Sequence, residues 1–274
     1  MLVFPNCKIN LGLQILSKRE DDYHNLETVF YPVQWTDALE IVPAEKTKFE
    51  SLGIHIPGDT ANNIVLKAYQ MLAKDFDLKP LKIILQKHLP VGAGLGGGSA
   101  NAAFMLKACN IFFELGLNSK DLENYATKLG ADCAFFIQNK PTLATGVGDV
   151  FENIELNLSA YQIIVIYPKK AINTAWAYAQ LKLKTEKRAS LKNIITQPIE
   201  TWKDSLVNDF EPEVIKVMPE IKSIKKNLYD SGAIYASMSG SGSSIYGIFK
   251  KDIDLENIKT KIEQPGYLIY TGNL

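Results

Sequence analysis

Apolar and polar residues alternate along several stretches of the chain, and this pattern predicts the strands of an α+β protein. Between residues 2 and 16 the apolar positions are interrupted by Lys8, Asn10 and Gln14, as in a half-buried strand. A charged turn at residues 17–22 precedes a further ordered segment. Additional strands are expected around residues 39–42, 81–87 and 161–167.

Apolar residues spaced three or four positions apart predict helices elsewhere. The first begins near Asn62, with Asp59, Thr60 and Asn62 as candidate caps, and its apolar face comprises Ile64, Val65, Ala68, Met71 and Leu72. Shorter helices are expected at residues 118–130, 174–182 and 199–208. The longest is expected from Glu211 to Tyr229 with Gly232 as its C-cap, and its core side comprises Val214, Val217, Met218, Ile221, Ile224 and Leu228.

The stretch from Pro90 to Ala102 is rich in glycine and stands between an expected strand and an expected helix. Such a turn lets the backbone approach an anion closely, and the first N–H groups of the helix supply positive potential. Ser99 or Asn101 is expected near the start of that helix. A tight structural turn is the plain alternative, although a turn rarely needs so many glycines.

The residues after the glycines show which known class of phosphate-binding loop this segment could belong to. A Walker A loop ends in Gly-Lys-Ser/Thr, whereas Gly98 is followed by Ser99 and Ala100. The spacing also satisfies a dinucleotide fingerprint, with the acidic Glu114 at about the required distance. That match is weak, because Glu114 is expected at a helix end with Gly116 as the C-cap rather than at the end of a second strand.

Composition and charge exclude several classes of protein. The 274 residues include 30 Lys and Arg against 30 Asp and Glu, so the formal net charge is +0. This balance argues against a general binder of nucleic acid or membrane surfaces. The cysteines Cys7, Cys109 and Cys133 lack metal-ligand spacing and are expected to be reduced core thiols. Since no apolar run approaches membrane-spanning length, a cytoplasmic protein is expected.

A change of composition around residues 146–157 suggests where the chain divides. We place the boundary near residue 155, giving an N-terminal domain over 1–155 and a C-terminal domain over 156–274. The second half ends in a strand pair that flanks another glycine- and serine-rich loop, residues 238–244. The chain therefore carries one such loop in each expected domain.

Three further groups of residues could carry chemistry. Lys8 and Asn10 lie two apart, so they project from the same face of a strand, although a solvated face is the plainer alternative. Asp132 is a single carboxylate among small and apolar residues, where a helix-capping role is equally expected. Tyr23 and His24 are adjacent, and His24 alone would be a structural histidine. Together with two glycine-rich loops, these are the parts of a phosphoryl transferase without a Walker motif.

Taken together, these motifs and their order along the chain resemble those of the GHMP kinase superfamily. Pro-Val-Gly-Ala-Gly-Leu-Gly-Gly-Gly-Ser at residues 90–99 resembles its second motif, and Ser-Gly-Ser-Gly-Ser-Ser at 239–244 resembles its third. Cys-Lys-Ile-Asn-Leu-Gly-Leu, Asp-Tyr-His-Asn-Leu-Glu-Thr, Leu-Gly-Ala-Asp-Cys-Ala-Phe-Phe and Asn-Asp-Phe-Glu resemble the members that phosphorylate a cytidine-diphosphate derivative of methylerythritol. The resemblance implies a two-domain α+β fold, with an N-terminal ribosomal-protein-S5-like domain and a C-terminal ferredoxin-like α/β sandwich.

The resemblance also implies a role for each matching residue. Asp132 would be the general base for the substrate 2-hydroxyl, and Lys8 would hold it ionised and offset charge on the γ-phosphate of ATP. Asn10 would orient the methylerythritol group and Asn63 would lie near the adenine. Tyr23 would stack on the cytosine, His24 would hydrogen-bond it, and Tyr178 would cover its other face. Ser239 would be one of the substrate-binding residues. The phosphates would be wrapped by Pro90, Val91, Gly92, Ala93, Gly94, Leu95, Gly96, Gly97, Gly98, Ser99 and Ala100.

The chain departs from the usual pattern at two places. Asp22 stands where the relatives usually have glycine, and we expect it to take the left-handed conformation that aspartate tolerates. Cys133 and Ala134 replace the commoner Val-Pro, which leaves the local stiffness open. No residue stands out as a dedicated metal ligand, so Mg²⁺ is expected to be carried by ATP and water.

Two other functions stay open at this stage. One is another small-molecule kinase of the superfamily, and the other is a non-catalytic nucleotide-binding protein on the same fold. Joint presence of Lys8 and Asp132 weighs against the second, because a protein that only binds needs no base. The expected partner is a small molecule with a cytidine diphosphate group, with no nucleic acid or membrane, and the protein is expected to be a monomer or weak dimer.

Overall fold

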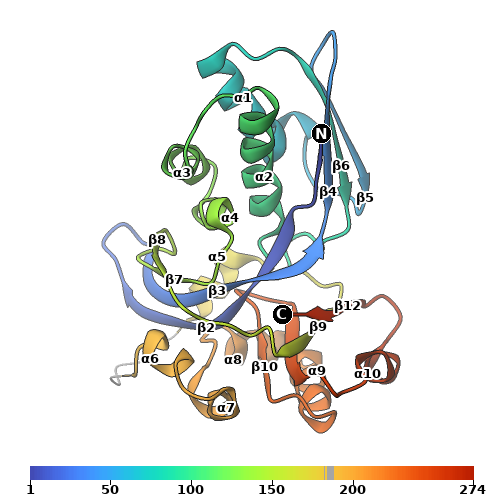
Figure 1. Ribbon diagram of the computed structural model, residues 1–274. Coiled ribbons are helices and arrows are strands. Elements are labelled where there is room, and N and C mark those ends of the chain that lie inside the picture. The colour runs from blue at the N-terminus through green and yellow to red at the C-terminus, as the bar shows by residue number, and fades with distance from the viewer. Residues whose placement is uncertain (182, 184–187) are drawn as a thin grey trace. The chain divides into compact units, whose positions relative to one another are not determined.

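A computed structural model describes residues 1–181, 183 and 188–274 of the chain (Figure 1). The described residues form two compact units that are discontinuous in sequence. Unit 1 comprises Met1–Cys7, Trp35–Val91 and Gly96–Lys140, and unit 2 comprises Lys8–Gln34, Gly92–Leu95 and Pro141–Leu274. The expected domains 1–155 and 156–274 divide the chain at a single point, and that division stays a prediction. Lys182, the last residue of one expected helix, lies outside the described residues.

Runs of strands and runs of helices follow one another along the chain, as expected of an α+β protein. The strands are β1 (Leu2–Val3), β2 (Asn6–Lys18), β3 (His24–Thr36), β4 (Ala38–Pro43), β5 (Lys48–Gly53), β6 (Leu81–Lys87), β7 (Thr142–Thr145), β8 (Val150–Asn153), β9 (Tyr161–Tyr167), β10 (Tyr235–Met238), β11 (Ile245–Lys250) and β12 (Leu268–Asn273). The α-helices are α1 (Ile64–Phe76), α2 (Gly97–Phe112), α3 (Ser119–Thr127), α4 (Phe135–Gln138), α5 (Thr174–Gln180), α6 (Leu191–Ile195), α7 (Trp202–Ser205), α8 (Glu211–Val217), α9 (Glu220–Asp230) and α10 (Leu255–Ile262). Short 3₁₀ turns are η1 (Thr60–Asn62), η2 (Ala131–Cys133) and η3 (Ile199–Thr201).

Unit 1 is a sheet with helices packed beside it. Its strand order is β1-β4-β6-β5, in which β5 runs parallel to β6 and the other pairs are antiparallel. Along β6 the residues Leu81, Ile83 and Leu85 are buried and alternate with less buried neighbours, so one face of the sheet faces the core. Helices α1 and α2 pack on each other and α2 contacts β4 (Figure 1).

The first expected helix, α1, is confirmed, and its buried face includes Val65, Ala68 and Leu72. Its N-cap is Asn63, whose side-chain oxygen accepts a hydrogen bond from the Val65 N–H at 2.9 Å. The caps expected at Asp59, Thr60 and Asn62 therefore precede the helix, and Asp59 caps the short turn η1 instead.

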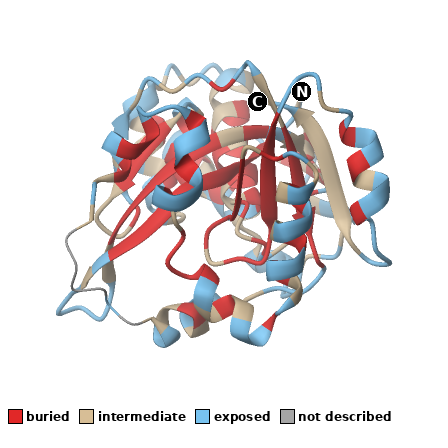
Figure 2. Cartoon of the chain, turned by 90° about the horizontal axis from the view of Figure 1, so that it is seen from below, coloured by how far each residue is buried: buried red, intermediate tan, exposed pale blue. Residues whose placement is uncertain are grey.

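Unit 2 contains two sheets, β2-β3-β7-β8 and β10-β11-β9-β12. The expected strand at residues 161–167 is confirmed as β9, which pairs antiparallel with both β11 and β12. Ile163, Ile164, Val165 and Ile166 are fully buried, as an interior strand covered on both faces requires. Buried positions, red in Figure 2, follow the strands, whereas exposed positions gather on loops and on the outer sides of helices.

The long helix expected from residue 211 to 229 is wrong in one respect. Two helices, α8 and α9, occupy this stretch, and they are separated at Met218 and Pro219. The residue before a proline is driven out of the helical region, and Met218 has φ −134° and ψ 74°. Val217, the last residue of α8, is 55% exposed rather than part of the core. The other expected core residues, Val214, Met218, Ile221, Ile224 and Leu228, are buried.

The helix after the glycine-rich loop begins where it was expected but ends earlier. Its N-cap is Gly96, which lies in the left-handed region, and α2 begins at Gly97. Ser99 is the third residue of the helix, near its start as expected. The helix ends at Phe112 with Phe113 as the C-cap, so the C-cap expected at Gly116 is wrong. Glu114 itself takes a φ of +53°, and it lies in a turn and not at the end of a strand.

Candidate functional site

The glycine-rich loop connects the end of β6 to the start of α2. Gly92, Gly94 and Gly96 have φ values of +66°, +79° and +69°, a region that side chains disfavour. No side chain in the described part of the chain caps the N-terminus of α2. The first N–H groups of this 16-residue helix are therefore presented by a bare backbone, as an anion site requires.

Within unit 1 the chain before this loop is anchored by a buried carboxylate, Asp37. One oxygen of Asp37 accepts hydrogen bonds from the N–H groups of His88 and Leu89, both at 2.7 Å. The other accepts from the Asn101 amide at 2.8 Å and pairs with the Lys87 ammonium. Burial lowers the pKa of Lys87, an effect that the Asp37 charge opposes. The carboxylate therefore joins the end of β6 to the first turns of α2.

Sequence reasoning missed this anchor. Asp37 stands alone between the apolar ends of β3 and β4, and Lys87 ends a strand, so each is ordinary when viewed alone. The available signal was the isolation of a carboxylate in an apolar stretch, since such a group must find partners when it is buried.

Asp132 lies on the short turn η2, which packs against α2 in unit 1. Its neighbour Cys133 is fully buried and shares a hydrogen bond with the Ser99 side chain. Burial raises the pKa of the Cys133 thiol to about 11, so the thiol is protonated at neutral pH. The structure thus brings the turn that carries Asp132 to the start of the helix that closes the glycine loop. The expected pairing of Asp132 with Lys8 stays a prediction.

Lys8 and Asn10 point from the same face of β2, as their spacing predicts, but that face is not solvated. Lys8 is 4% exposed and Asn10 is 2% exposed, so the plainer alternative of a solvated strand face is wrong. The Lys8 ammonium donates to the side-chain oxygen of Asn10 at 2.7 Å and to the carbonyl of Gly94 at 3.4 Å. It also lies 4.6 Å from the centre of the Phe30 ring.

The second glycine- and serine-rich loop meets this cluster in unit 2. The hydroxyl of Ser239 accepts a hydrogen bond from the Asn10 N–H at 3.2 Å and donates to the Gly94 carbonyl at 2.9 Å. The Asn10 amide donates to the Thr28 hydroxyl at 2.9 Å, and the Tyr246 hydroxyl donates to the Asn10 carbonyl at 2.7 Å. Lys8, Asn10, Gly94 and Ser239 are therefore brought together. Thr28 and Tyr246 were missed by sequence reasoning, because nothing local distinguishes them from ordinary strand residues.

The aromatic candidates lie at the start of β3 and on α5. Tyr23 is 64% exposed and is free to meet a ligand with its ring face. The rings of His24 and Tyr178 stack with centroids 5.2 Å apart, and Tyr178 meets Phe210 edge-on at 4.9 Å. The structure thus brings two of the three residues expected at a cytosine site into direct contact.

The turn before Tyr23 adopts the conformation expected for the departure at Asp22. This residue has a φ of +64°, in the left-handed region, which glycine adopts without strain. Its carboxylate is exposed and lies 2.8 Å from the Lys18 ammonium. The neighbouring Asp21 accepts hydrogen bonds from the Arg19 guanidinium and from the Tyr23 N–H, and the Arg19 bond lowers the pKa of Asp21.

The remaining expectations concern Asn63, the cysteines, metal ligands and membrane-spanning helices. Asn63, expected near adenine, uses its oxygen to cap α1, and its role toward a nucleotide stays a prediction. All three cysteines are buried and unbridged, as expected of core thiols. Within the described ranges no group of three or more His, Cys, Asp or Glu side chains could hold a metal ion. None of the helices in the described residues is long and apolar enough to cross a membrane.

Comparison with known proteins places the chain in a family. Residues 63–140 match the GHMP kinases N terminal domain and residues 190–268 match the GHMP kinases C terminal family. A 4-diphosphocytidyl-2-C-methyl-D-erythritol kinase of Bacteroides fragilis is 52% identical over 256 residues, covering 92% of this chain and 93% of the relative. The enzyme of the same name from Chlorobium phaeobacteroides is 38% identical over 258 residues, covering 92% of this chain and 90% of the relative.

Solved structures agree with this placement. A crystal structure of 4-(cytidine 5'-diphospho)-2C-methyl-D-erythritol kinase superposes with a TM-score of 0.84 at 26% identity, covering 99% of this chain and 98% of that one. The Methanococcus jannaschii mevalonate kinase superposes with a TM-score of 0.73 at 13% identity, covering 99% and 97% of the two chains, and this likeness concerns the fold alone. The chain belongs to the GHMP kinases and, within them, to the family of 4-diphosphocytidyl-2-C-methyl-D-erythritol kinases.

Proposed function

We propose that the protein is an ATP-dependent kinase that phosphorylates the 2-hydroxyl of 4-diphosphocytidyl-2-C-methyl-D-erythritol, in the non-mevalonate pathway of isoprenoid synthesis. The observation that carries the proposal is the 52% identity to a relative named for this kinase, which extends over 92% of the chain. The buried Lys8–Asn10 pair and the bare start of α2 support it, because phosphoryl transfer depends on positioned reactants and on neutralised charge.

The phosphates of ATP would lie along residues 90–100. The positive φ values of Gly92, Gly94 and Gly96 support this role, because they turn backbone N–H groups toward a ligand without side chains in the way. The segment from Pro90 to Ala100 contains no carboxylate. We therefore propose that Mg²⁺ arrives with the nucleotide, held by phosphate and water oxygens, which are ligands that this cation prefers.

Asp132 would accept the proton of the attacking hydroxyl while the γ-phosphate moves to that oxygen. Support comes from its position on η2 beside the start of α2, where a helix N-terminus favours negative groups. Lys8 would offset the charge that develops on the transferring phosphate. Its ammonium is already oriented by Asn10 and by the Gly94 carbonyl, so little reorganisation is needed during the reaction.

The cytidine end of the substrate would be recognised by Tyr23, His24 and Tyr178. The exposed ring of Tyr23 offers a stacking face, and the His24 ring offers a donor and an acceptor. Contact between His24 and Tyr178 supports a shared site for one flat ring system. Asn10 and Ser239 would face the methylerythritol group.

The direct test is a substrate screen with purified protein, ATP and Mg²⁺. We expect the cytidylyl substrate to gain one phosphate, detected by mass spectrometry and by a phosphomonoester signal in ³¹P NMR. Mevalonate and homoserine serve as matched controls, since solved kinases with this fold act on them. Turnover of either control together with no turnover of the cytidylyl substrate would overturn the proposal in favour of another kinase of the superfamily.

A second test separates a kinase from a protein that only binds nucleotide. D132N keeps the size of the side chain but removes the base, so we expect a large fall in kcat with ATP affinity largely kept. Loss of ATP affinity with turnover unchanged would contradict the assigned role. Equilibrium binding of a fluorescent ATP analogue provides the affinity, and the substrate assay provides kcat.

The proposed substrate also suggests where the enzyme acts and in which assembly state. Its substrate is a small, charged nucleotide derivative, and we propose that it acts in the cytoplasm as a monomer or weak dimer, without nucleic-acid or membrane partners. Sedimentation velocity at several protein concentrations tests the assembly state.

A further inference from the structure

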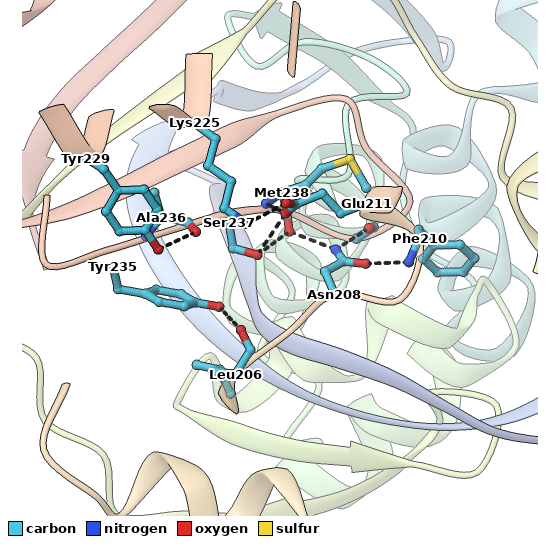
Figure 3. Close-up of polar contacts among 11 residues, drawn as sticks. Leu206, Asn208, Phe210, Glu211, Lys225, Tyr229, Tyr235, Ala236, Ser237 and Met238 are labelled. Atoms are coloured by element: carbon cyan, nitrogen blue, oxygen red, sulfur yellow. Dashed lines mark hydrogen bonds and ion pairs between the residues drawn. The ribbon is translucent and has the colours of Figure 1, made fainter. Parts of the chain in front are cut away.

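We propose that Asn208 is a positioning residue for phosphoryl transfer, acting through the second glycine- and serine-rich loop, residues 238–244. The inference rests on the proposed kinase function. Asn208 lies just before α8 in unit 2, is 5% exposed, and is drawn in Figure 3 with the residues around it. The backbone on either side of Asn208 pairs with Leu13 of β2, whereas its side chain bonds Met238, Gly240 and Phe210. The effect of the side chain on Lys8 and Asn10 therefore passes through the loop.

The amide of Asn208 holds the loop at two points. Its nitrogen donates to the carbonyls of Met238 and Gly240, both at 2.8 Å, and its oxygen accepts from the Phe210 N–H at 2.9 Å (Figure 3). The two carbonyls flank Ser239. One side chain therefore satisfies both backbone acceptors around that residue, while its own oxygen is fixed to the start of α8.

Ser239 carries this constraint into the candidate site. Its hydroxyl bonds the Asn10 N–H and the Gly94 carbonyl, and the Asn10 side chain in turn accepts from the Lys8 ammonium at 2.7 Å. A continuous series of hydrogen bonds thus runs from Asn208 through the loop to the residue proposed to offset phosphate charge. Ser239 is 0% exposed, so water does not replace these bonds.

Glu211 supports the end of β10, at the first residue of the loop. Its carboxylate accepts from the Met238 N–H at 3.1 Å and pairs with the Lys225 ammonium (Figure 3). Met238 is therefore held at its N–H by Glu211 and at its carbonyl by Asn208. With the strand end fixed from one side, removal of Asn208 releases the turn around Ser239 in particular.

The test compares N208A with a matched control, Y229F. The Tyr229 hydroxyl lies in the same region, where it donates to the Ala236 carbonyl at 3.2 Å and accepts from the Ala236 N–H at 3.1 Å, two residues before the loop begins (Figure 3). Both variants lose hydrogen bonds and are expected to lower Tm. Only N208A is expected to lower kcat, by roughly 10- to 100-fold, because displacement of reacting groups by about 1 Å costs up to that much.

A third variant, N208D, gives a readout that a structural role would not move. Its new carboxylate faces two carbonyls, so it repels them when ionised but donates to one of them when protonated. We expect kcat of N208D relative to the wild type to rise as pH falls, while kcat of Y229F follows the wild type at every pH. Circular dichroism at the assay temperature establishes that each variant is folded.

Two results would overturn the inference. One is a folded N208A whose kcat stays within twofold of the wild type. The other is an equal loss of kcat in N208A and Y229F, since the effect would then come from general destabilisation. Absence of activity in the wild-type protein itself speaks against the proposed function, and the ratio of variant to wild type tests Asn208 separately.

Discussion

Removal of the Lys87 charge should destabilise the protein through the carboxylate that it leaves behind. Asp37 is 0% exposed and Lys87 is 2% exposed, so the pair is shielded from water. Truncation of one partner of a buried ion pair costs about 3–5 kcal/mol, because the other charge is left without compensation. For K87M we expect a loss of that size, or a fall in Tm of roughly 6–20 °C by the usual conversion for large domains.

The double variant D37N/K87M should recover much of this loss. With both charges gone, the amide at position 37 can still accept from the N–H groups of His88 and Leu89. Its nitrogen replaces the oxygen that accepts from the Asn101 amide nitrogen, and it can donate to the Asn101 oxygen once that amide turns over, because Lys87 no longer needs the oxygen. Replacing a buried pair by neutral groups of similar shape is often close to neutral. We therefore expect the double variant to lose about 3 kcal/mol less than the sum of the two single losses.

The measurement is urea unfolding of the wild type, both single variants and the double variant. Circular dichroism and tryptophan fluorescence should be followed together, since coincident transitions justify the free energies. Losses that add to within about 0.5 kcal/mol would refute the reasoning, because they would mean that the two charges do not interact. Nucleotide affinity should also weaken in K87M, since Asp37 fixes the chain that enters the glycine-rich loop proposed to bind phosphate.

Three further predictions concern single positions. In G94A a new Cβ would lie 2.0 Å from the Ser239 carbonyl oxygen at a φ of +79°, so chemical denaturation should show a loss of about 2–5 kcal/mol. G98A, whose Cβ meets nothing within 4 Å among the described residues, should change stability little, and similar losses in both variants would refute the steric argument. D22A should melt roughly 2–4 °C below D22G in a thermal scan, since alanine is strained at φ +64°, and equal Tm values would contradict this. Burial raises the pKa of Cys133 to about 11 and of Cys109 to about 12, so at pH 8 both thiols are protonated and should react with Ellman's reagent slowly until the protein is unfolded; a fast burst from either in the folded protein would count against it.

Much of the fold could be predicted, because local patterns determine it. The helical spacing after Asn63 and the apolar run of β9 each define their own element, and both are confirmed. The helix break at Pro219 also has a local cause, because proline disfavours a helix interior, yet the apolar spacing predicts one continuous helix. Errors of this kind concern where an element ends rather than whether it exists.

The polar interior could not be predicted in the same way. Asp37 and Lys87 are 50 residues apart, and no local pattern states that they meet. The alternation along β2 correctly placed Lys8 and Asn10 on one face, but alternation alone cannot reveal that this face is covered as well. Only the tertiary arrangement shows that the lysine is oriented by Asn10 and Gly94 and not by solvent.

The close approach of Gly94 to the loop at Ser239 has a consequence for how such sequences can diverge. Gly94 and Ser239, 145 residues apart, are in contact, and there is no room for a side chain between their segments. A Cβ at Gly94 would lie 2.0 Å from the Ser239 carbonyl oxygen, and one at Gly240 would lie 3.2 Å from the Gly94 carbonyl oxygen. Neither segment can accept an insertion or a larger residue unless the other changes in compensation. During evolution, substitutions in one of these two segments should be accompanied by substitutions in the other. Replacing one segment alone with that of a distant homologue should give a protein that does not fold.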